Sequence, residues 1–216
     1  MLITVILYYS LFLIVLTIGV VRYKKLTTPY KILLLNVAII FIWEIVSKYC
    51  AIKYKNNMPI AHISAYTDFF LNGLIFYYLF KSKLFKRMIL IGMGLIIMFF
   101  IFNSLKLQPY NNVFPSNALL VTEIIYVTLS LLIFKQMLQY PLQINITRQS
   151  IFWFNTAILF FSTTAFLNYG LINYVVKHHL DYLIAYYCGF VTNMIFYTLI
   201  GMSILIDDKN IAANNA

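Results

Sequence analysis

The chain has 216 residues, of which 62% are hydrophobic and only 10% are charged. A soluble domain carries about a quarter charged residues, so this composition excludes an ordinary water-soluble fold. The formal net charge of +10 does not indicate nucleic-acid binding, because the lysines and arginines cluster in short segments that flank hydrophobic runs, as anchors do in membrane proteins.

Seven apolar stretches follow one another along the chain. A hydrocarbon layer about 30 Å thick requires roughly 20 helical residues to cross it, and apolar runs of that length predict transmembrane helices. The stretches cover about residues 2–21, 32–52, 63–80, 88–105, 118–138, 151–172 and 182–206. All five prolines fall between them, where they do not interrupt a helix. We therefore predict an all-α integral membrane protein, a seven-transmembrane-helix bundle in one domain, 1–206, followed by a short cytoplasmic tail, 207–216.

Basic residues are unequally divided between the two sets of loops. One side holds Arg22, Lys24, Lys25, Lys31, Lys81, Lys83, Lys86, Arg87, Lys135, Arg148 and Lys209. The loops of the other side hold only Lys53, Lys55, Lys106 and Lys177. The positive-inside rule then predicts that the N-terminus is outside and the C-terminus cytoplasmic.

Four ionisable residues lie inside the predicted spans: Glu44 and Lys48 in the second, Asp68 in the third and Glu123 in the fifth. With the predicted orientation all four fall in the outer half of the bilayer, and Asp68 lies about 8 Å below the outer boundary at ~1.5 Å per residue. Such residues are costly in a membrane and usually face a bundle interior or a water-filled cavity. We therefore predict an outward-facing pocket that binds a ligand or couples to an ion.

The partners of these groups remain open. Glu44 and Lys48 stand four residues apart, the spacing of a local ion pair on one helix, and the Lys48 side chain is long enough to reach the interface. Asp68 and Glu123 have no basic partner on their own helices. We expect them to be protonated, hydrogen-bonded to other helices, or paired with Lys48 across the bundle.

Further polar residues extend the predicted site. Asn72 follows Asp68 by four residues and shares its helix face, and Asn193 lies in the middle of the last span. An interhelical hydrogen bond, worth about 0.6 kcal/mol in membranes, explains either asparagine more simply when it is taken alone. Taken with the acids, these residues indicate a polar interior between the helices.

No metal site, cofactor or enzyme activity is predicted. His62, His178, His179 and Asp181 are expected on the outer side, where they could bind a metal or respond to pH, but a solvated loop explains them more simply. The two cysteines match no metal or redox spacing. No hydrolase, kinase, phosphate-loop or zinc-protease motif is present.

A displacement of the chain by 120 residues places the first three spans over the last three. It aligns Asp68–Phe80 (DFFLNGLIFYYLF) with Cys188–Ile200 (CGFVTNMIFYTLI). Such a repeat is typical of carriers built from two halves, although a chain this rich in Phe, Ile, Leu and Tyr also produces such matches by chance. If the repeat is real, it predicts two triple-helix halves around the fourth span.

Three segments together carry a family resemblance. They are Thr28–Lys48 (TPYKILLLNVAIIFIWEIVSK), Asn56–Lys81 (NNMPIAHISAYTDFFLNGLIFYYLFK) and Gln149–Tyr169 (QSIFWFNTAILFFSTTAFLNY). This pattern resembles a family of small, uncharacterised bacterial seven-transmembrane-helix proteins, similar to the N-terminal membrane sensor modules of some histidine kinases. In that family an acid, usually glutamate, stands where Asp68 stands here, and others correspond to Glu44 and Glu123. The resemblance implies a multi-pass protein of the bacterial inner membrane.

The leading hypothesis is a stand-alone seven-helix sensor or receptor-like signalling protein. Its outward polar pocket would bind an unknown small ligand, and its basic cytoplasmic loops would meet membrane lipids and a signalling partner such as a histidine kinase. One alternative is a small three-plus-one-plus-three transporter that uses the intramembrane acids for substrate or proton coupling. The other is a structural or assembly subunit of a membrane complex.

Overall fold

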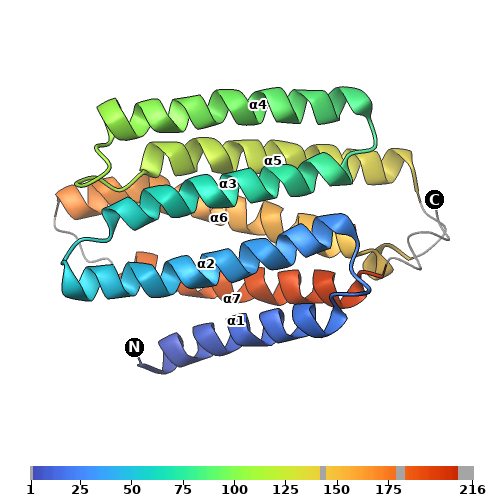
Figure 1. Cartoon of the computed structure of the whole chain (residues 1–216), viewed down its shortest axis with the longest axis horizontal. Coiled ribbons are helices and arrows are strands. Elements are labelled where there is room, and N and C mark those ends of the chain that lie inside the picture. Colours follow the sequence, from blue (N-terminus) through green and yellow to red (C-terminus); the bar gives the residue numbers. More distant parts are fainter. Residues whose placement is uncertain (1, 142–144, 179–182, 209–216) are drawn as a thin grey trace.

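The computed structural model describes residues 2–141, 145–178 and 183–208, and its long elements are all helices (Figure 1). In chain order these are α1 (Leu2–Arg22), α2 (Thr28–Lys53), α3 (Met58–Leu79), α4 (Lys83–Phe102), the π-helical turn η1 (Asn103–Leu107), α5 (Ser116–Gln139), the short 3-10 turn η2 (Ile146–Arg148), α6 (Ser150–Lys177) and α7 (Leu183–Ile206). The described residues form no strand. The predicted all-α class, with seven long helices, is confirmed.

Three helices begin four or five residues before the predicted span. α2 begins at Thr28 rather than 32, α3 at Met58 rather than 63, and α4 at Lys83 rather than 88. The first turn of a helix has no intrahelical partners for its N–H groups, so proline and polar residues are tolerated there. Pro29 and Pro59 occupy this first turn, and the expectation that every proline lies between helices is therefore wrong for these two.

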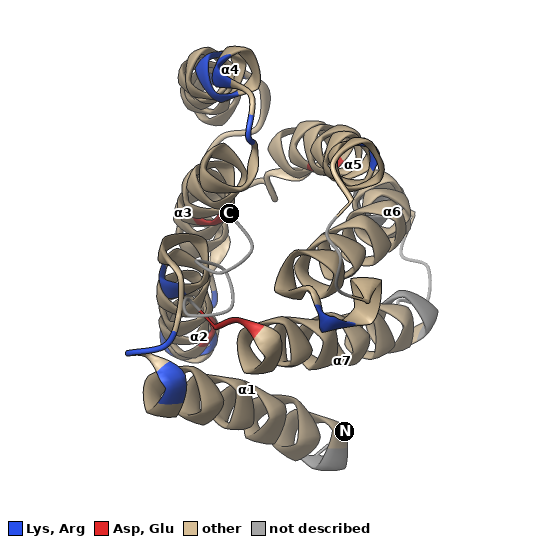
Figure 2. Cartoon of the chain, turned by 90° about the vertical axis from the view of Figure 1, so that its right-hand side faces the viewer, with Lys and Arg blue, Asp and Glu red and all other residues tan. Residues whose placement is uncertain are grey.

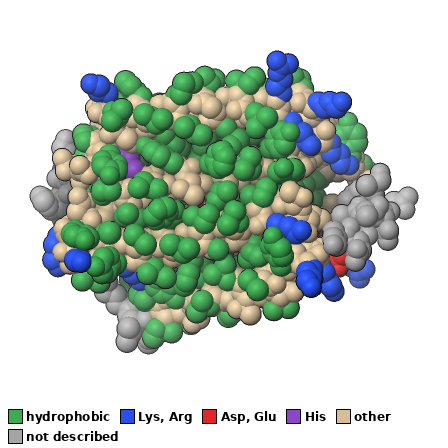
Figure 3. Space-filling view, in the orientation of Figure 1, with side chains coloured by type: hydrophobic (Ala, Val, Ile, Leu, Met, Phe, Trp, Pro, Cys, Tyr) green, Lys and Arg blue, Asp and Glu red, His purple; other side chains and the backbone are tan. Residues whose placement is uncertain are grey.

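Six of the described helices are long and apolar enough to cross a membrane, namely α1, α2, α4 with η1, α5, α6 and α7. Large apolar side chains cover the face of the bundle seen in Figure 3, and along α4 and η1 Leu84, Leu95 and Leu105 are more than half exposed. A water-soluble protein rarely exposes so continuous an apolar surface. The structure therefore supports a multi-pass membrane protein.

α3 is the long helix outside this set, and its position explains its polarity. It lies between α2, α4 and α5 (Figure 1), so neighbouring helices cover most of its surface. His62 and Asn72 are buried on it. A helix whose polar side chains face other protein segments does not need the apolar composition that contact with lipid requires.

Six helices form a closed ring in the order α1, α2, α3, α5, α6, α7, and α4 packs outside it against α3 (Figure 2). The most extensive contacts join α6 to α5 and α7, α2 to α3, and α1 to α7. The seams between α1 and α2 and between α3 and α5 involve fewer residues. This arrangement differs from two triple-helix halves around a fourth span, because α1 packs mainly against α7 and α4 stands at the periphery.

The two ends of the bundle differ in charge. One end, here called the basic end, contains the connections 23–27 and 80–82 and the described residues 140–141 and 145–149. Its described basic residues are Arg22, Lys24, Lys25, Lys31, Lys81, Lys83, Lys86, Arg87, Lys135 and Arg148 (Figure 2). The other end, here called the Asn57 end, contains the connections 54–57 and 108–115. Residues 209–216 of the predicted tail, His179 and Asp181 lie outside the described residues.

Asp207 joins three segments at the basic end. Its carboxylate accepts hydrogen bonds from the Thr27 backbone N–H (2.7 Å) and hydroxyl (3.1 Å) and from the Ser150 hydroxyl (3.2 Å). The Arg22 guanidinium donates to the Asp207 backbone carbonyl at 2.9 Å. These bonds tie the end of α7 to the α1–α2 connection and to the start of α6.

This tie predicts a pH-dependent stability. Burial raises the pKa of the Asp207 carboxyl, because desolvation outweighs the hydrogen bonds from Thr27 and Ser150. A raised pKa means that folding favours the protonated carboxyl, so the stabilisation from Asp207 is complete below its unfolded pKa of about 3.9 and is lost as the pH rises through the folded value. We therefore compare the melting temperatures of the wild type and of Asp207→Asn. The wild-type value minus the variant value should fall as the pH is raised from about 3 to about 7. A difference that stays constant or grows would contradict this assignment.

Candidate functional site

A cavity of about 330 Å³ lies inside the helix ring. Side chains from α1, α2, α3, α5, α6 and α7 line it, and none comes from α4. Its volume is at the lower end of the range for small-molecule sites. The six helices of the ring therefore share the wall of this cavity, while α4 packs against α3 from outside.

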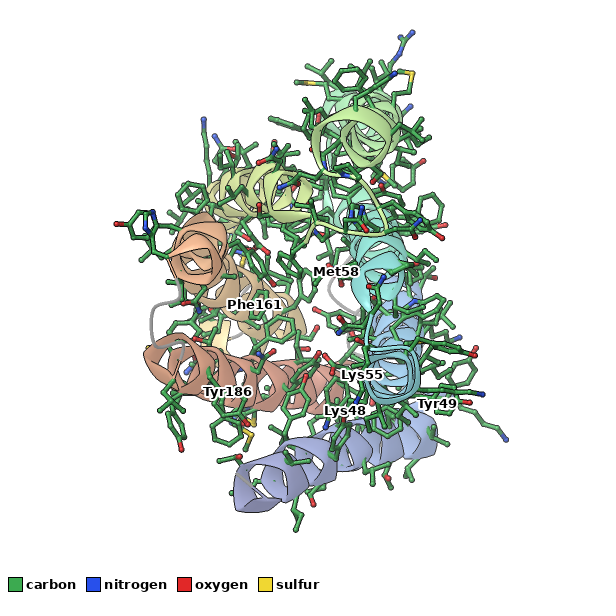
Figure 4. The ribbon with its side chains drawn as sticks, turned by 90° about the vertical axis from the view of Figure 1, so that its left-hand side faces the viewer. Lys48, Tyr49, Lys55, Met58, Phe161 and Tyr186 are labelled. Carbon is green, nitrogen blue, oxygen red and sulfur yellow. The ribbon has the colours of Figure 1, made fainter. Side chains whose placement is uncertain are left out.

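The cavity occupies the half of the bundle nearer the Asn57 end. Asn57 and Phe114, from the two connections at that end, both line it. Figure 4 views the bundle from this end, with α2 and α3 as one wall, Phe161 on the opposite wall and Tyr49 on the outer side of α2. Toward the basic end the cavity gives way to a tightly packed core.

Aromatic rings form the floor between these two halves. The Phe76 ring lies 5.7 Å from that of Phe154 and 6.0 Å from that of Tyr126, and Phe154 lies 6.5 Å from Tyr30, measured between ring centroids. Phe76 and Phe154 are fully buried. Rings contributed by α2, α3, α5 and α6 thus close the cavity on the side of the basic end.

The structure brings five of the six predicted site residues to the cavity wall. These are Glu44, Asp68, Asn72, Glu123 and Asn193. Because α3 begins at Met58, Asp68 lies ten residues from the helix start, roughly 15 Å along the axis rather than about 8 Å. The acids predicted to share one depth do face a common space.

Lys48 is the exception. Its side chain is exposed, and its ammonium lies 4.2 Å from the centre of the Tyr9 ring. Glu44 and Lys48 are both described, and no direct ion pair joins them, although their charges interact at longer range. The Lys48 stem follows the seam between α1 and α2 toward Tyr9, and Lys48 is not among the residues that line the cavity.

Asp68 is held by three donors from three helices. Asn36 and Asn72 donate to Asp68 Oδ1 at 3.0 Å and 2.8 Å, and the Tyr126 hydroxyl lies 3.4 Å from Asp68 Oδ2. Such a set stabilises an acceptor that has left water. Asn36 precedes Glu44 by eight residues on the same helix face, so its spacing would have been sufficient to include it in the predicted site. Tyr126 follows Glu123 by three residues on the same helix, so its spacing was an equal reason to include it in the predicted site.

Glu123 has a different environment. Its side chain is 3% exposed, and its Oε2 atom has no hydrogen-bond partner. The Ser162 hydroxyl stands nearby but is also without a partner, and Asp68 is close enough for the two acids to interact electrostatically. A buried carboxyl oxygen that accepts no hydrogen bond costs stability.

Tyrosines connect the acids around the wall. Tyr8 stands beside the Glu44 carboxyl, and Tyr169 is within electrostatic range of Glu44, Asp68 and Glu123. The wall is therefore made of acids, amides and aromatic rings. It offers acceptors and π-faces to a bound molecule.

The prediction that His62 lies in a solvated loop is wrong. His62 is fully buried on α3, and its ring nitrogens lie 2.7 Å from the Ser104 hydroxyl and 3.0 Å from the Val113 carbonyl. These two interactions hold Ser104 and Val113, at either end of the segment 103–115, against α3 near the Asn57 end. Among the described residues, no group of three or more His, Cys, Asp or Glu side chains is close enough to hold a metal ion.

Comparison with protein-family models, with curated proteins and with solved structures finds no match for this chain.

The contrast between the two acids predicts opposite stability effects. Asp68→Ala should lower the free energy of unfolding by about 1–3 kcal/mol, because three donors lose their acceptor, and Asp68→Asn should lower it less. Glu123→Met should leave the melting temperature unchanged or raise it, since it removes a buried polar atom that has no partner. Melting of the purified protein in detergent, with Ser64→Ala as the control at the same cavity, tests both. A larger loss for Glu123→Met than for Asp68→Ala would refute the distinction.

Proposed function

We propose that this chain is a seven-span receptor-like membrane protein, with an outside N-terminus, a cytoplasmic C-terminus and a ligand pocket open to the outside. The distribution of basic residues supports the orientation, because positively charged loops remain cytoplasmic and the basic end carries most of them. α3 is the seventh span in this proposal. Its polar side chains are covered by α2, α4 and α5, which makes its passage through the bilayer compatible with its composition.

The observation that carries the proposal is the single-sided cavity. It reaches the Asn57 end, where Asn57 and Phe114 line it, and is closed toward the basic end by the aromatic floor. A ligand at the acids can then affect the other side only through helix packing. Signalling of this kind requires two packing states that the ligand binds unequally.

Tyr126 provides the physical connection between pocket and floor. Its hydroxyl lies 3.4 Å from Asp68 Oδ2, and its ring lies 6.0 Å from Phe76. A ligand that draws the Asp68 carboxyl away would release the Tyr126 hydroxyl at the contact between α3 and α5. Few residues of these two helices are in contact. Movement there would separate α2 and α3 from α5 and α6 at the basic end.

The basic end is the surface proposed for the cytoplasmic partner. Lys24, Lys25, Lys83, Arg87 and Arg148 are exposed there. The resemblance to histidine-kinase sensor modules favours a kinase or regulator recruited as a separate chain, in a bacterial inner membrane. Anionic lipids are expected to occupy the same basic surface when the partner is absent.

The orientation has a direct test. In a background of Cys50→Ser and Cys188→Ser, we expect a membrane-impermeant thiol reagent to label Ser64→Cys, in the cavity wall, from outside intact cells. The matched Lys25→Cys variant, at the basic end, should be labelled only after the membrane is permeabilised. The opposite pattern would reverse the proposed orientation.

The signalling role is tested by crosslinking in native membranes, affinity purification and mass spectrometry. A cytoplasmic kinase or regulator should be recovered stoichiometrically, and its recovery should fall when Lys24 and Lys25 are changed together to Glu. Ligand uptake into proteoliposomes without any recovered partner would instead favour a transporter. Dependence of the protein's own stability on another membrane subunit would favour the assembly role.

A further inference from the structure

The cavity wall has a strongly one-sided charge. The chain contains six Asp and Glu residues and 16 Lys and Arg residues. Three of the acids, Glu44, Asp68 and Glu123, line the cavity, and no Lys, Arg or His is among the described residues that do so. When they are ionised, these acids give the enclosed space a negative potential, and that potential favours a positive ligand.

Glu123 differs from Asp68 in its hydrogen bonds. Asp68 already has three donors, but Glu123 Oε2 is buried, lines the cavity and has no hydrogen-bond partner. Buried carboxylates in proteins are normally paired or hydrogen-bonded. Glu123 Oε2 is therefore able to accept a hydrogen bond or a cation that comes from outside the chain.

Aromatic rings specify the kind of cation. Trp43, Phe161, Tyr169 and Phe196 come from three helices and line the same space as the acids. Cations are attracted to the faces of such rings, and recognition of organic ammonium groups commonly uses several of them together. A bare metal ion needs a compact set of oxygen ligands, whereas this wall mixes dispersed carboxyls with rings around a volume of about 330 Å³.

We propose that the cavity binds a small organic cation, an amine or quaternary ammonium compound, with its charged group beside Glu123 and Asp68 and its apolar part against the aromatic wall. The inference rests on the proposed outward-facing receptor pocket and gives that pocket a ligand class. Asn193 and Ser64 also line the cavity and can accept hydrogen bonds from a primary amine.

The two tryptophans of the chain provide a reporter. Trp43 lines the cavity, while Trp153 lies at the basic end and donates to the Thr147 carbonyl at 2.8 Å. In the full-length Trp153→Phe variant, Trp43 alone supplies the tryptophan fluorescence. Purified protein in nanodiscs would be titrated with tetramethylammonium, choline and benzyltrimethylammonium, each compared with the neutral isostere in which carbon replaces the nitrogen.

We expect a saturable change of Trp43 fluorescence with at least one cation, and binding of its neutral isostere weaker by about tenfold or more. Equal affinity for cation and isostere, or no response to any of the three cations, would overturn the inference. This comparison needs no change in the cavity, so it does not depend on whether a variant folds.

Variants then locate the site. Glu123→Gln should weaken cation binding by about tenfold or more, whereas Asp208→Asn, at the other end of the bundle, should leave it unchanged. Each variant is first checked for wild-type size-exclusion and melting behaviour. Wild-type cation affinity in a folded Glu123→Gln protein would remove Glu123 from the site and contradict the proposal as stated.

The outcomes separate this inference from the receptor proposal. Outside labelling of Ser64→Cys with no cation response keeps the outward pocket and rejects its ligand class. A selective cation response with labelling only from the basic side keeps the ligand class and rejects the orientation. A cation that binds selectively and also accumulates in proteoliposomes would identify the same site as that of a carrier.

Discussion

A carboxyl group that leaves water must find other polar groups, and in a bundle surrounded by lipid these come mainly from the protein's own side chains and backbone. This constraint explains how the chain is arranged around Asp68. Asn36 reaches it from α2, Asn72 from its own helix and Tyr126 from α5, so one acid fixes three neighbouring elements. Glu123 breaks the same rule at its Oε2 atom. A buried oxygen without a partner costs stability, so Asp68 and Glu123 contribute differently to the stability of the same wall.

The two halves of the bundle differ in how tightly their side chains are packed. Near the basic end, rings and branched side chains such as Phe76, Phe154 and Ile200 are fully buried, and close packing there transmits small displacements because it cannot absorb them. Near the Asn57 end, the polar cavity leaves space for side chains to move. Asp207 holds the packed half together from its outer side through Thr27 and Ser150. A displacement of the acids would therefore act first on the packed aromatic layer and then on the hydrogen bonds of Asp207.

Hydropathy was sufficient to predict seven helices, and the cost of buried charge was sufficient to predict Glu44, Asp68 and Glu123 as a group. Residue spacing failed where the outcome depends on helix neighbours. Lys48 stands four residues from Glu44, yet its direction is set by Tyr9 on α1, which sequence spacing does not reveal. His62 lies near a helix start and was expected in solvent, but Ser104 and Val113 cover it from a distant segment. The peripheral place of α4 likewise follows from packing and not from its composition.

The position of α4 outside the ring has a topological consequence. α3 and α5 are neighbours that run in the same direction, from the Asn57 end to the basic end (Figure 1). α4 returns the chain from the basic end to the Asn57 end and so allows this parallel pairing. If α4 failed to insert during synthesis, α5 would have to enter the membrane in the reverse direction, and Glu123 would then face the half of the bundle opposite to Asp68. A helix that contributes no side chain to the cavity thus determines whether the cavity can be assembled.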